Sequence, residues 1–329
     1  MVRLMRAVVL ESYGDVEVLQ LKEIPDPVAG REEIVVDLAA TAMNRADLLQ
    51  RRGMYPGPPS EFEVPGLEFA GTVAEVGADV HAWSVGDEVM GIVAGGSYAE
   101  KLVINQRQVM AVPAGVGLPD AAAIPEVFLT AFDALVAQGG LTSGRWALIH
   151  GGGSGVGTAG IQIAKAVGAR VIVTASAAKH AACVELGADE VVDYQNERFE
   201  ERVAAATNGR GVDVVLDIIG GDYLVPNIKS LRTGGKILQV GVMGGGKVEV
   251  PLGLLMPKRA SLIGTVLRSR PLEEKAALTQ QFIHEMLPRF EDGTLRPVID
   301  SRYSLGDIAA AHTYMETNAN IGKILITMA

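Results

Sequence analysis

Apolar and polar positions follow two different periods along the chain, and the period changes near residue 125. In the segment 32–44, Ile34, Val36 and Leu38 occupy every second position, which is typical of a half-buried strand. Four further β-rich runs, separated by glycine and proline turns, are FAGTVAEVG, GDEVMGIV, SYAEKLVIN and QVMAVP. The first part of the chain is therefore predicted to be a mostly antiparallel β region.

Strands and helices alternate beyond a helix candidate at residues 120–140, which is interrupted near Pro125. Six short apolar runs predict buried strands, with helical segments between most of them: WALIHG, RVIVTAS, EVVDY, VDVVLDIIG, KILQVGV and SLIGTVL. Such alternation favours a doubly wound parallel sheet covered on both faces. The predicted fold class is α/β, with a mostly antiparallel β domain beside this parallel sheet domain.

The tail from about Ser269 holds two helix candidates, EKAALTQQFIHEML and LGDIAAAHTYME, and a strand, GKILITM. It is too short to bury a core of its own. We therefore expect residues 1–125 and 269–329 to form one discontinuous domain, into which residues 126–268 are inserted.

The composition of the chain limits the classes of molecule that it is expected to bind. The 329 residues are 48% hydrophobic and carry a net charge of -10 without a run of Lys or Arg, which disfavours nucleic acid and anionic membranes and leaves small molecules. A single cysteine, Cys183, excludes an intrachain disulfide framework and a zinc site built from several thiolates. No apolar run approaches about 18 residues. We expect a soluble protein in the reducing cytoplasm.

The segment 150–165, HGGGSGVGTAGIQIAK, places a glycine-rich turn between a predicted strand and a predicted helix. This arrangement presents free backbone N–H groups and the positive end of the helix dipole to a phosphate. The dinucleotide fingerprint G-x-G-x-x-G maps onto Gly152, Ser154 and Gly157, with serine in the middle position and Gly155 beside it. The context favours a dinucleotide site over a purely structural turn.

The end of the second predicted strand bears on the choice of dinucleotide. An NAD site places an acid there to bind the ribose 2′-hydroxyl, but this chain has Thr174, Ala175 and Ser176. Lys179 and Tyr194 follow nearby and offer a cation and a hydroxyl to a 2′-phosphate. The alternative is that Lys179 is a solvated helix residue and Tyr194 the end of a strand. The pattern favours NADPH over NADH.

Metal and nucleophilic chemistry find little support in the sequence. The five histidines are scattered, none forms a metal-ligand motif with Cys183, and no G-x-S-x-G elbow appears. Hydride transfer without a metal remains, in which the protein orients the nicotinamide and supplies polar groups where charge develops.

Several segments in order, with the glycine turn among them, resemble one family over essentially the whole chain: MNRADLLQRRGMYPGPP, PGLEFAGTVAEVG, AAAIPEVFLTAF, IHGGGSGVGTAGIQ, GVMGGG, LRSR and NANIGKIL. The chain resembles the zinc-free quinone oxidoreductase branch of the medium-chain dehydrogenase/reductase superfamily. The resemblance implies a GroES-like domain, a Rossmann domain, a cleft between them and NADPH-dependent quinone reduction. Where zinc-dependent relatives carry cysteine and Gly-His-Glu, this chain reads AMNRAD and Gly66-Leu67-Glu68.

The resemblance also implies roles for individual residues. Asn44, Tyr55 and Thr130 would lie near the nicotinamide and its ribose, and Asn320 would close the site. The remaining cofactor contacts would come from the pyrophosphate turn, the 2′-phosphate pocket and the wall behind the nicotinamide: Gly152, Ser154, Gly155, Val156 and Gly157; Ser176, Lys179 and Tyr194; Gly241, Val242, Met243, Gly244 and Leu267.

Alternative interpretations remain at this level. Asn44 could act only as a helix N-cap and Tyr55 only as loop packing, whereas Arg45, Asp47 and Glu68 fit structural polar groups better than catalytic ones. In the favoured mechanism, Tyr55 or Asn44 donates a hydrogen bond to the oxyanion that develops as hydride reaches a quinone.

Two other functions stay open: an NADPH-dependent alkenal/enone reductase, and a nucleotide-binding protein with little catalysis. The apolar run SLIGTVL predicts a homodimer, because an unpaired apolar strand at a sheet edge is prone to aggregate.

Overall fold

The computed structural model describes residues 3–55 and 57–328. The chain forms two compact units. Unit 1 comprises Met1–Glu126 and Arg268–Ala329, and unit 2 comprises Val127–Leu267. No helix in the part of the chain that the structure describes is long and apolar enough to cross a membrane.

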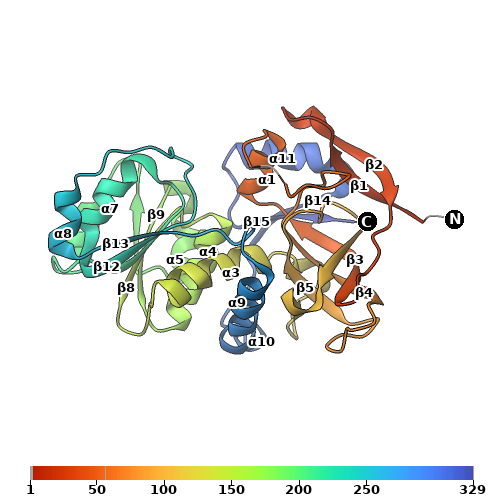
Figure 1. Cartoon of the computed structure of the whole chain (residues 1–329). Helices are drawn as coiled ribbons and strands as arrows, with labels where there is room; N and C mark the ends of the chain where they lie inside the picture. Colours follow the sequence, from red (N-terminus) through yellow and green to blue (C-terminus); the bar gives the residue numbers. More distant parts are fainter. Residues whose placement is uncertain (1–2, 56, 329) are drawn as a thin grey trace. The chain divides into compact units, whose positions relative to one another are not determined.

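Unit 2 is built around a six-stranded parallel sheet of order β10-β9-β8-β11-β12-β13, of which β8, β9, β12 and β13 are labelled in Figure 1. Numbered within the unit, this is the 3-2-1-4-5-6 order of a dinucleotide-binding fold. Its strands are β8 (Trp146–His150), β9 (Arg170–Ala175), β10 (Glu190–Asp193), β11 (Val212–Asp217), β12 (Leu231–Gln239) and β13 (Ser261–Gly264). The predicted parallel sheet is confirmed.

The helices of unit 2 connect successive strands. The longest, α4 (Gly155–Ala166), buries Ile161, Ile163 and Ala164, and it packs against β8 and β9. The other helical elements are η3 (Asp133–Gln138, a π-helical turn), α5 (His180–Glu185), α6 (Phe199–Ala206), α7 (Leu224–Ser230), α8 (Leu255–Lys258) and the short turns η4 (Ala177–Lys179), η5 (Gly221–Tyr223) and η6 (Leu252–Leu254). Helix α3 (Pro125–Phe132) crosses from unit 1 into unit 2.

Unit 1 contains a seven-stranded, mostly antiparallel sheet in the order β14-β15-β3-β4-β5-β7, with β6 paired to β3. A separate antiparallel hairpin joins β1 to β2. The strands are β1 (Leu4–Leu10), β2 (Leu19–Pro25), β3 (Glu33–Ala42), β4 (Glu68–Val76), β5 (Glu88–Ile92), β6 (Lys101–Asn105), β7 (Val109–Ala111), β14 (Ile299–Ser304) and β15 (Lys323–Thr327).

The C-terminal segment contributes directly to this sheet. Strand β15 pairs antiparallel with β3, where Ile326 faces Thr41, and parallel with β14. The helical elements of unit 1 are α1 (Arg45–Arg51), α2 (Leu118–Ala121), α9 (Leu272–Glu285), α10 (Pro288–Glu291), α11 (Ile308–Glu316) and the short turns η1 (Val16–Val18), η2 (Gln106–Gln108) and η7 (Leu305–Asp307).

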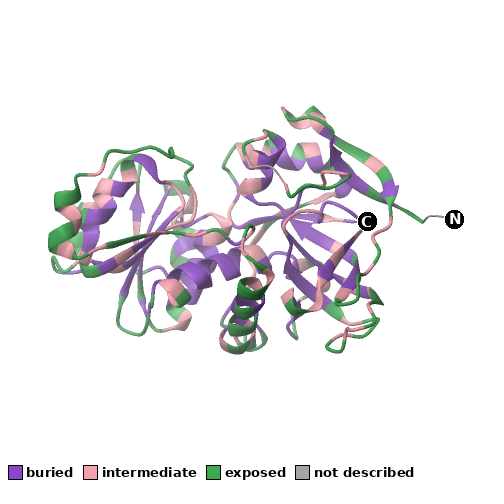
Figure 2. Ribbon diagram, viewed as in Figure 1, coloured by how far each residue is buried: buried purple, intermediate pink, exposed green. Residues whose placement is uncertain are grey.

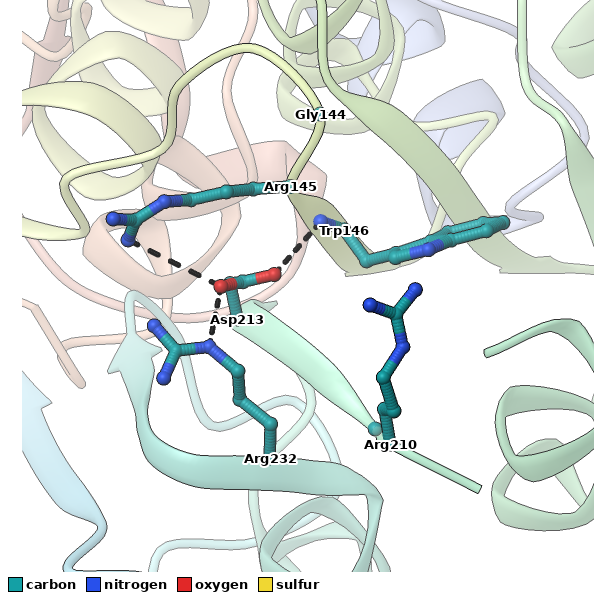
Figure 3. Close-up of a pocket in the computed structure, with 7 residues that line it drawn as sticks. Gly144, Arg145, Trp146, Arg210, Asp213 and Arg232 are labelled. Carbon is teal, nitrogen blue, oxygen red and sulfur yellow. Dashed lines mark hydrogen bonds and ion pairs between the residues drawn. The ribbon is translucent and has the colours of Figure 1, made fainter. Parts of the chain in front are cut away.

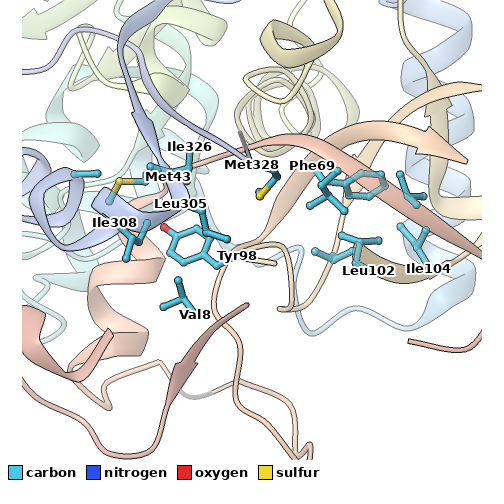
Figure 4. Close-up of a cluster of buried hydrophobic side chains, with 14 of the residues drawn as sticks. Val8, Met43, Phe69, Tyr98, Leu102, Ile104, Leu305, Ile308, Ile326 and Met328 are labelled. Carbon is cyan, nitrogen blue, oxygen red and sulfur yellow. The ribbon is translucent and has the colours of Figure 1, made fainter. Parts of the chain in front are cut away.

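Each sheet carries its own apolar core, visible as the buried strands of Figure 2. In unit 1 the core joins residues that are distant in sequence, such as Val8, Phe69, Tyr98 and Ile326 (Figure 4). In unit 2 the central strands β8, β9 and β11 are almost wholly buried, as their unbroken apolar runs require, whereas the edge strand β13 has no buried residue.

The structure adds three strands that the pattern did not single out, namely β1, β2 and β14. Strand β14 reads IDSRYS and has no buried residue, so its sequence lacks the apolar alternation by which a strand is predicted. Its place is set by pairing with β15. The predicted helix at 120–140 is divided into α2, α3 and η3, and α3 begins at Pro125, a residue well suited to the first turn of a helix.

Candidate functional site

The glycine turn of unit 2 follows the carboxyl end of β8, at the edge of the sheet where ligands bind in open α/β folds. Gly151 has φ +71°, which favours glycine, and the N–H of Gly152 donates to the Thr174 carbonyl at 2.9 Å. A Cβ at Gly152 would lie 2.9 Å from Val173, and one at Gly157 would lie 2.1 Å from the Gly151 carbonyl oxygen. Only bare backbone allows this close packing of turn, strand and helix.

The serine in the middle of the fingerprint has a structural explanation. Ser154 is the N-cap of α4, and its hydroxyl accepts a hydrogen bond from the N–H of Gly157 at 3.0 Å. The helix begins at Gly155, so the N–H groups of Gly155 and Val156 belong to its first turn. Serine in place of the middle glycine of the fingerprint therefore preserves the helix N-terminus to which a pyrophosphate binds.

Of the three residues predicted around a 2′-phosphate, Lys179 lies against this turn, and Ser176 and Tyr194 follow the ends of β9 and β10. Ala175 pairs with Asp193 across β9 and β10, so Ser176 and Tyr194 leave the ends of neighbouring strands. The stem of Lys179 packs over the turn, since a Cβ at Gly153 would lie 2.5 Å from its Cδ. The residues at the end of β9 include no carboxylate, and the pocket formed by Ser176, Lys179 and Tyr194 stays a prediction.

Cys183 lies beneath the turn, where it is fully buried. Burial raises the pKa of its thiol to about 11, and the nearby Lys179 only partly opposes the shift. The thiol therefore stays protonated at neutral pH and serves as packing.

A buried polar network supports the carboxyl edge of the sheet, and the sequence did not reveal it. His150 Nε2 lies 2.7 Å from Asn227 Oδ1, and Asn227 Nδ2 donates to Asp217 Oδ2 at 2.9 Å. Asp217 Oδ1 accepts the N–H groups of Ile219 and Gly220, which fixes the loop after β11. Burial lowers the pKa of His150, so this network holds a neutral imidazole.

The loop Gly241–Gly244 follows β12 and rests on the loop after β11. The N–H of Gly244 donates to the Ile219 carbonyl at 2.7 Å, and Gly241 approaches Ile218 so closely that its Cβ would lie 3.0 Å from the carbonyl oxygen. Val242 and Met243 stay exposed. Two other predicted contacts of unit 2 are buried elsewhere, Thr130 on α3 and Leu267 beyond β13.

In unit 1, Asn44 belongs to a buried charged cluster. Lys323 Nζ lies 2.8 Å from Glu68 Oε1 and donates to Asn44 Oδ1 and to the Met43 carbonyl, both at 2.6 Å. The side chains of Lys323 and Glu68 are 3% and 0% exposed. The amine thus supplies a positive charge to Glu68, the residue that follows Leu67 at the start of β4.

The same cluster uses the whole amide of Asn44. Its Nδ2 donates to Glu68 Oε1 at 2.8 Å and to the Ala42 carbonyl at 3.1 Å, and its Oδ1 accepts from Lys323. Asn44 is also the N-cap of α1, with its backbone N–H donating to Asp47 Oδ2 at 2.7 Å. Both amide hydrogens therefore have acceptors within the fold.

Tyr55 is half-buried and lies against Arg268. The guanidinium carbon of Arg268 is 4.6 Å from the centre of the Tyr55 ring, and its Nη1 donates to the Tyr55 carbonyl at 3.1 Å. Burial raises the pKa of the phenol, and Glu126 adds to the shift. Tyr55 is therefore a protonated hydroxyl at neutral pH.

Glu126, at the start of α3, is the most perturbed carboxyl group near these residues. Its backbone N–H donates to Glu68 Oε2 at 2.8 Å. Burial, followed by the negative charge of Glu68, raises its pKa to about 8, against the opposing charges of Lys323 and Arg268. Its side chain is therefore largely protonated at neutral pH.

A third buried group links α1 to α11. The Tyr98 hydroxyl donates to Asp47 Oδ2 at 3.0 Å and lies 3.4 Å from His312 Nε2. Burial raises the pKa of Asp47 to about 6 and lowers that of His312 to about 3. This position of Asp47 agrees with a structural role.

Asn320, close to Lys323 in sequence, is buried and donates to the Gly322 carbonyl at 3.0 Å.

The described residues offer no group of three or more His, Cys, Asp or Glu side chains that could hold a metal ion.

Three residues that organise unit 1 were not identified from the sequence. Lys323, Glu126 and Arg268 all fall inside quoted motifs, but their partners lie far away along the chain. A lysine within the apolar strand pattern GKILITM is the signal that could have drawn attention to Lys323.

Two family models match the chain. The model described as alcohol dehydrogenase GroES-like domain matches residues 30–114, and the model described as zinc-binding dehydrogenase matches residues 155–283. The quinone oxidoreductase of Lama guanicoe is 31% identical over 331 residues, covering 99% of this chain and 98% of that protein. The chain belongs to the medium-chain dehydrogenase/reductase superfamily.

Solved structures agree with this membership. The mycobacterial protein Rv1454c, complexed with NADPH, is 29% identical with a TM-score of 0.89, covering 98% of this chain and 99% of that one. The JamJ enoyl reductase in its apo form is 27% identical with a TM-score of 0.89, covering 99% of this chain and 100% of that one. Both support an NAD(P)-dependent oxidoreductase with a GroES-like and a Rossmann-like domain.

Part of a much longer protein also matches. The phenolphthiocerol synthesis polyketide synthase Pks15/1 of Mycobacterium bovis is 33% identical over 320 residues, which cover 96% of this chain and 15% of that protein. This medium-chain dehydrogenase/reductase thus spans only a small share of the synthase.

Proposed function

We propose that this medium-chain dehydrogenase/reductase is an NADPH-dependent, zinc-independent quinone oxidoreductase. The observation that carries the proposal is the environment of the glycine turn, where Lys179 packs over Gly153 and Ser176 and Tyr194 end adjacent strands. A cation and two hydroxyls suit a ribose 2′-phosphate, and the end of β9 has no acid to repel it.

The residues present fit a bound dinucleotide, since the crowded glycines keep the approach to the N-terminus of α4 free of side chains. Bound NADPH would supply a hydride to the substrate. Gly152, Ser154, Gly155, Val156 and Gly157 would hold the pyrophosphate. The nicotinamide half would be held by the residues that the family resemblance assigns to it: Asn44, Tyr55, Thr130, Gly241, Val242, Met243, Gly244, Leu267 and Asn320.

Unit 1 supplies the polar group for the chemistry. We assign to Tyr55 the hydrogen bond to the developing oxyanion, because its phenol keeps its proton at neutral pH. Asn44 is a positioning residue in this proposal, since Glu68 and the Ala42 carbonyl already accept its two amide hydrogens.

A second candidate is reduction of an enal or enone C=C bond. The likeness to an enoyl reductase structure favours it, and the same oxyanion donor would serve an enolate. A third candidate, a nucleotide-binding protein with little catalysis, predicts NADPH binding without turnover.

Steady-state oxidation of NADPH and NADH with matched panels of quinones and enones tests the proposal. We expect quinone turnover with at least a tenfold preference for NADPH in kcat/KM, because each charge-assisted hydrogen bond to the phosphate contributes about 1.5–3 kcal/mol. The Lys179→Ala variant should bind NADPH more weakly and should bind NADH with nearly unchanged affinity. Turnover restricted to enones would select the reductase alternative, binding without turnover would select the nucleotide-binding protein, and equal use of the two cofactors would contradict the 2′-phosphate pocket.

The proposal includes two further properties. Zinc independence rests on Leu67 beside Glu68, and stoichiometric zinc in elemental analysis together with loss of activity on chelation would reject it. A homodimer in the cytoplasm is proposed because β13 is an edge strand with Leu262 48% exposed, and the lone buried Cys183 suits a reducing compartment. A monomeric mass in light scattering at micromolar concentration would contradict the dimer.

A further inference from the structure

A cavity of about 260 Å³ opens at the amino ends of the strands of unit 2 (Figure 3). It is lined by Gly144, Arg145, Trp146, Arg210, Gly211, Asp213 and Arg232. The glycine turn follows the opposite, carboxyl end of β8, and five residues of strand separate the two edges by about 16 Å at ~3.3 Å per residue. The cavity is therefore distinct from the proposed cofactor site.

Three arginines and a single carboxylate line this cavity, and two of the arginines contact the carboxylate. Arg232 Nε donates to Asp213 Oδ1, and Arg145 Nη1 lies 4.0 Å from the same oxygen. Asp213 Oδ2 accepts the N–H of Trp146 at 2.9 Å. The lining thus carries three positive charges and one negative charge, a local excess of two positive charges on a chain whose net charge is -10.

Asp213 explains the position of Arg232 but not that of Arg210. The one hydrogen bond that the described residues provide for the Arg210 side chain is from Nε to the Thr207 carbonyl, at a long 3.5 Å. Figure 3 shows its guanidinium turned toward the space between Asp213 and Trp146. If the cluster served only to hold the amino edge of the sheet, Arg210 would add repulsion to it without an ion pair.

We propose that this cavity binds the phosphate group of a small phosphomonoester. A phosphate monoester carries about -1.5 to -2 charges at neutral pH, which matches the local excess, and its oxygens accept the paired N–H groups of arginine. The volume approaches the ~300 Å³ at which small-molecule pockets begin, so it accommodates more than the phosphate alone. Arg210 and Arg145 provide the binding groups, and Asp213 holds Arg232 in place.

Calorimetric titration at constant ionic strength tests this site, with inorganic phosphate and ribose 5-phosphate as probes. The titrations use the full chain with and without NADPH, so that binding at the cofactor turn is separated from binding at the cavity. We expect one saturable site per chain, and binding at this site should persist when NADPH is present. Ribose 5-phosphate should bind more tightly than inorganic phosphate if the natural ligand is an organic monoester, and the two affinities should be equal if the natural ligand is free phosphate. Malonate binding as tightly as phosphate would overturn the assignment to a phosphoryl group.

Variants locate the binding. Arg210→Ala should weaken it at least tenfold, which corresponds to about 1.4 kcal/mol, whereas Asp213→Asn should tighten it several-fold because it removes the competing charge and keeps an acceptor for Trp146. Arg198→Ala is the matched control, since Arg198 pairs with Glu200 and Glu201 at the start of α6, away from the cavity.

Absence of saturable binding, equal affinity in Arg210→Ala and wild type, or an equal loss in Arg198→Ala would overturn the proposal. A loss on Lys179→Ala but not on Arg210→Ala would place the phosphate at the cofactor turn and would overturn it as well. None of these outcomes depends on quinone turnover, so the cavity and the proposed function are tested separately.

Discussion

Replacing Lys323 with methionine should destabilise unit 1 more than the loss of any exposed lysine. The amine lies 2.8 Å from Glu68 Oε1, where two unit charges at an effective dielectric of about 20 attract by about 6 kcal/mol. In the variant Glu68 keeps two donors, Asn44 Nδ2 and the N–H of Glu126, which offset part of this loss. We therefore expect a decrease of about 3–5 kcal/mol in the free energy of unfolding, as is usual when one partner of a buried pair is removed.

The two tryptophans allow unit 1 to be followed alone. Trp83 lies in unit 1 and Trp146 in unit 2, so the fluorescence of Trp83 in a Trp146→Phe background reports urea unfolding of unit 1. Lys101→Met is the matched control, because Lys101 pairs with Asp26 at 2.8 Å in the same sheet but is 27% exposed, and its loss should cost under about 1 kcal/mol.

A double-variant cycle separates the ion pair from simple packing. Adding Glu68→Gln to Lys323→Met removes the uncompensated charge and should recover about 2 kcal/mol or more. The reasoning fails if Lys323→Met costs no more than Lys101→Met, or if Glu68→Gln lowers stability equally with and without Lys323.

Three other predictions concern the site. Ser176→Asp should lower the NADPH/NADH ratio of kcat/KM at least tenfold in steady-state assays, because the new carboxylate repels a 2′-phosphate; Ala175, only 2% exposed, is the poorer position, and an unchanged ratio would argue against the pocket. Tyr55→Phe should lower kcat roughly 10²–10³-fold with little change in NADPH affinity measured by fluorescence, and unchanged kcat would leave Tyr55 a positioning role. Glu126 binds its proton more tightly in the folded state, with a pKa of about 8 against 4.5, so stability should fall as pH rises from 5 to 8. Glu126→Gln should flatten that dependence by roughly 2–4 kcal/mol in urea unfolding followed at each pH, and the same slope in the variant would refute the assignment.

Local pattern was enough to predict the parallel sheet and the glycine turn, because both are written in contiguous residues. The strands of unit 2 are short apolar runs between helices, and the turn directly precedes α4. The serine at the middle position of the fingerprint, Ser154, is explained only by the structure, because its hydroxyl accepts a hydrogen bond from the N–H of Gly157 in the first turn of α4.

The features that the sequence did not reveal depend on partners far along the chain. Strand β14 has no buried residue and is defined by β15, while Lys323 finds its charge partner on β4. The pKa of Glu126 is likewise set by distant groups, since Glu68 on β4 raises it while Lys323 on β15 and Arg268 oppose that rise. Periodicity describes which face of an element is apolar, but it carries no information about which distant element will cover a polar group.

The position of β15 also determines the order in which the protein can fold during synthesis. Unit 2 is one continuous stretch, so its sheet can close as soon as β13 leaves the ribosome. The sheet of unit 1 has to wait, because β15 lies in its interior between β3 and β14, and β3 is made about 280 residues earlier. Strand β6 covers residues 33–37 on this edge of β3, so at 5–20 residues per second it is the end at Ala40–Ala42 that waits roughly 14–56 seconds for β15. A nascent chain is therefore exposed to wrong strand pairing at the Ala40–Ala42 end of β3, and a chaperone that shields this end would act on a late step of assembly.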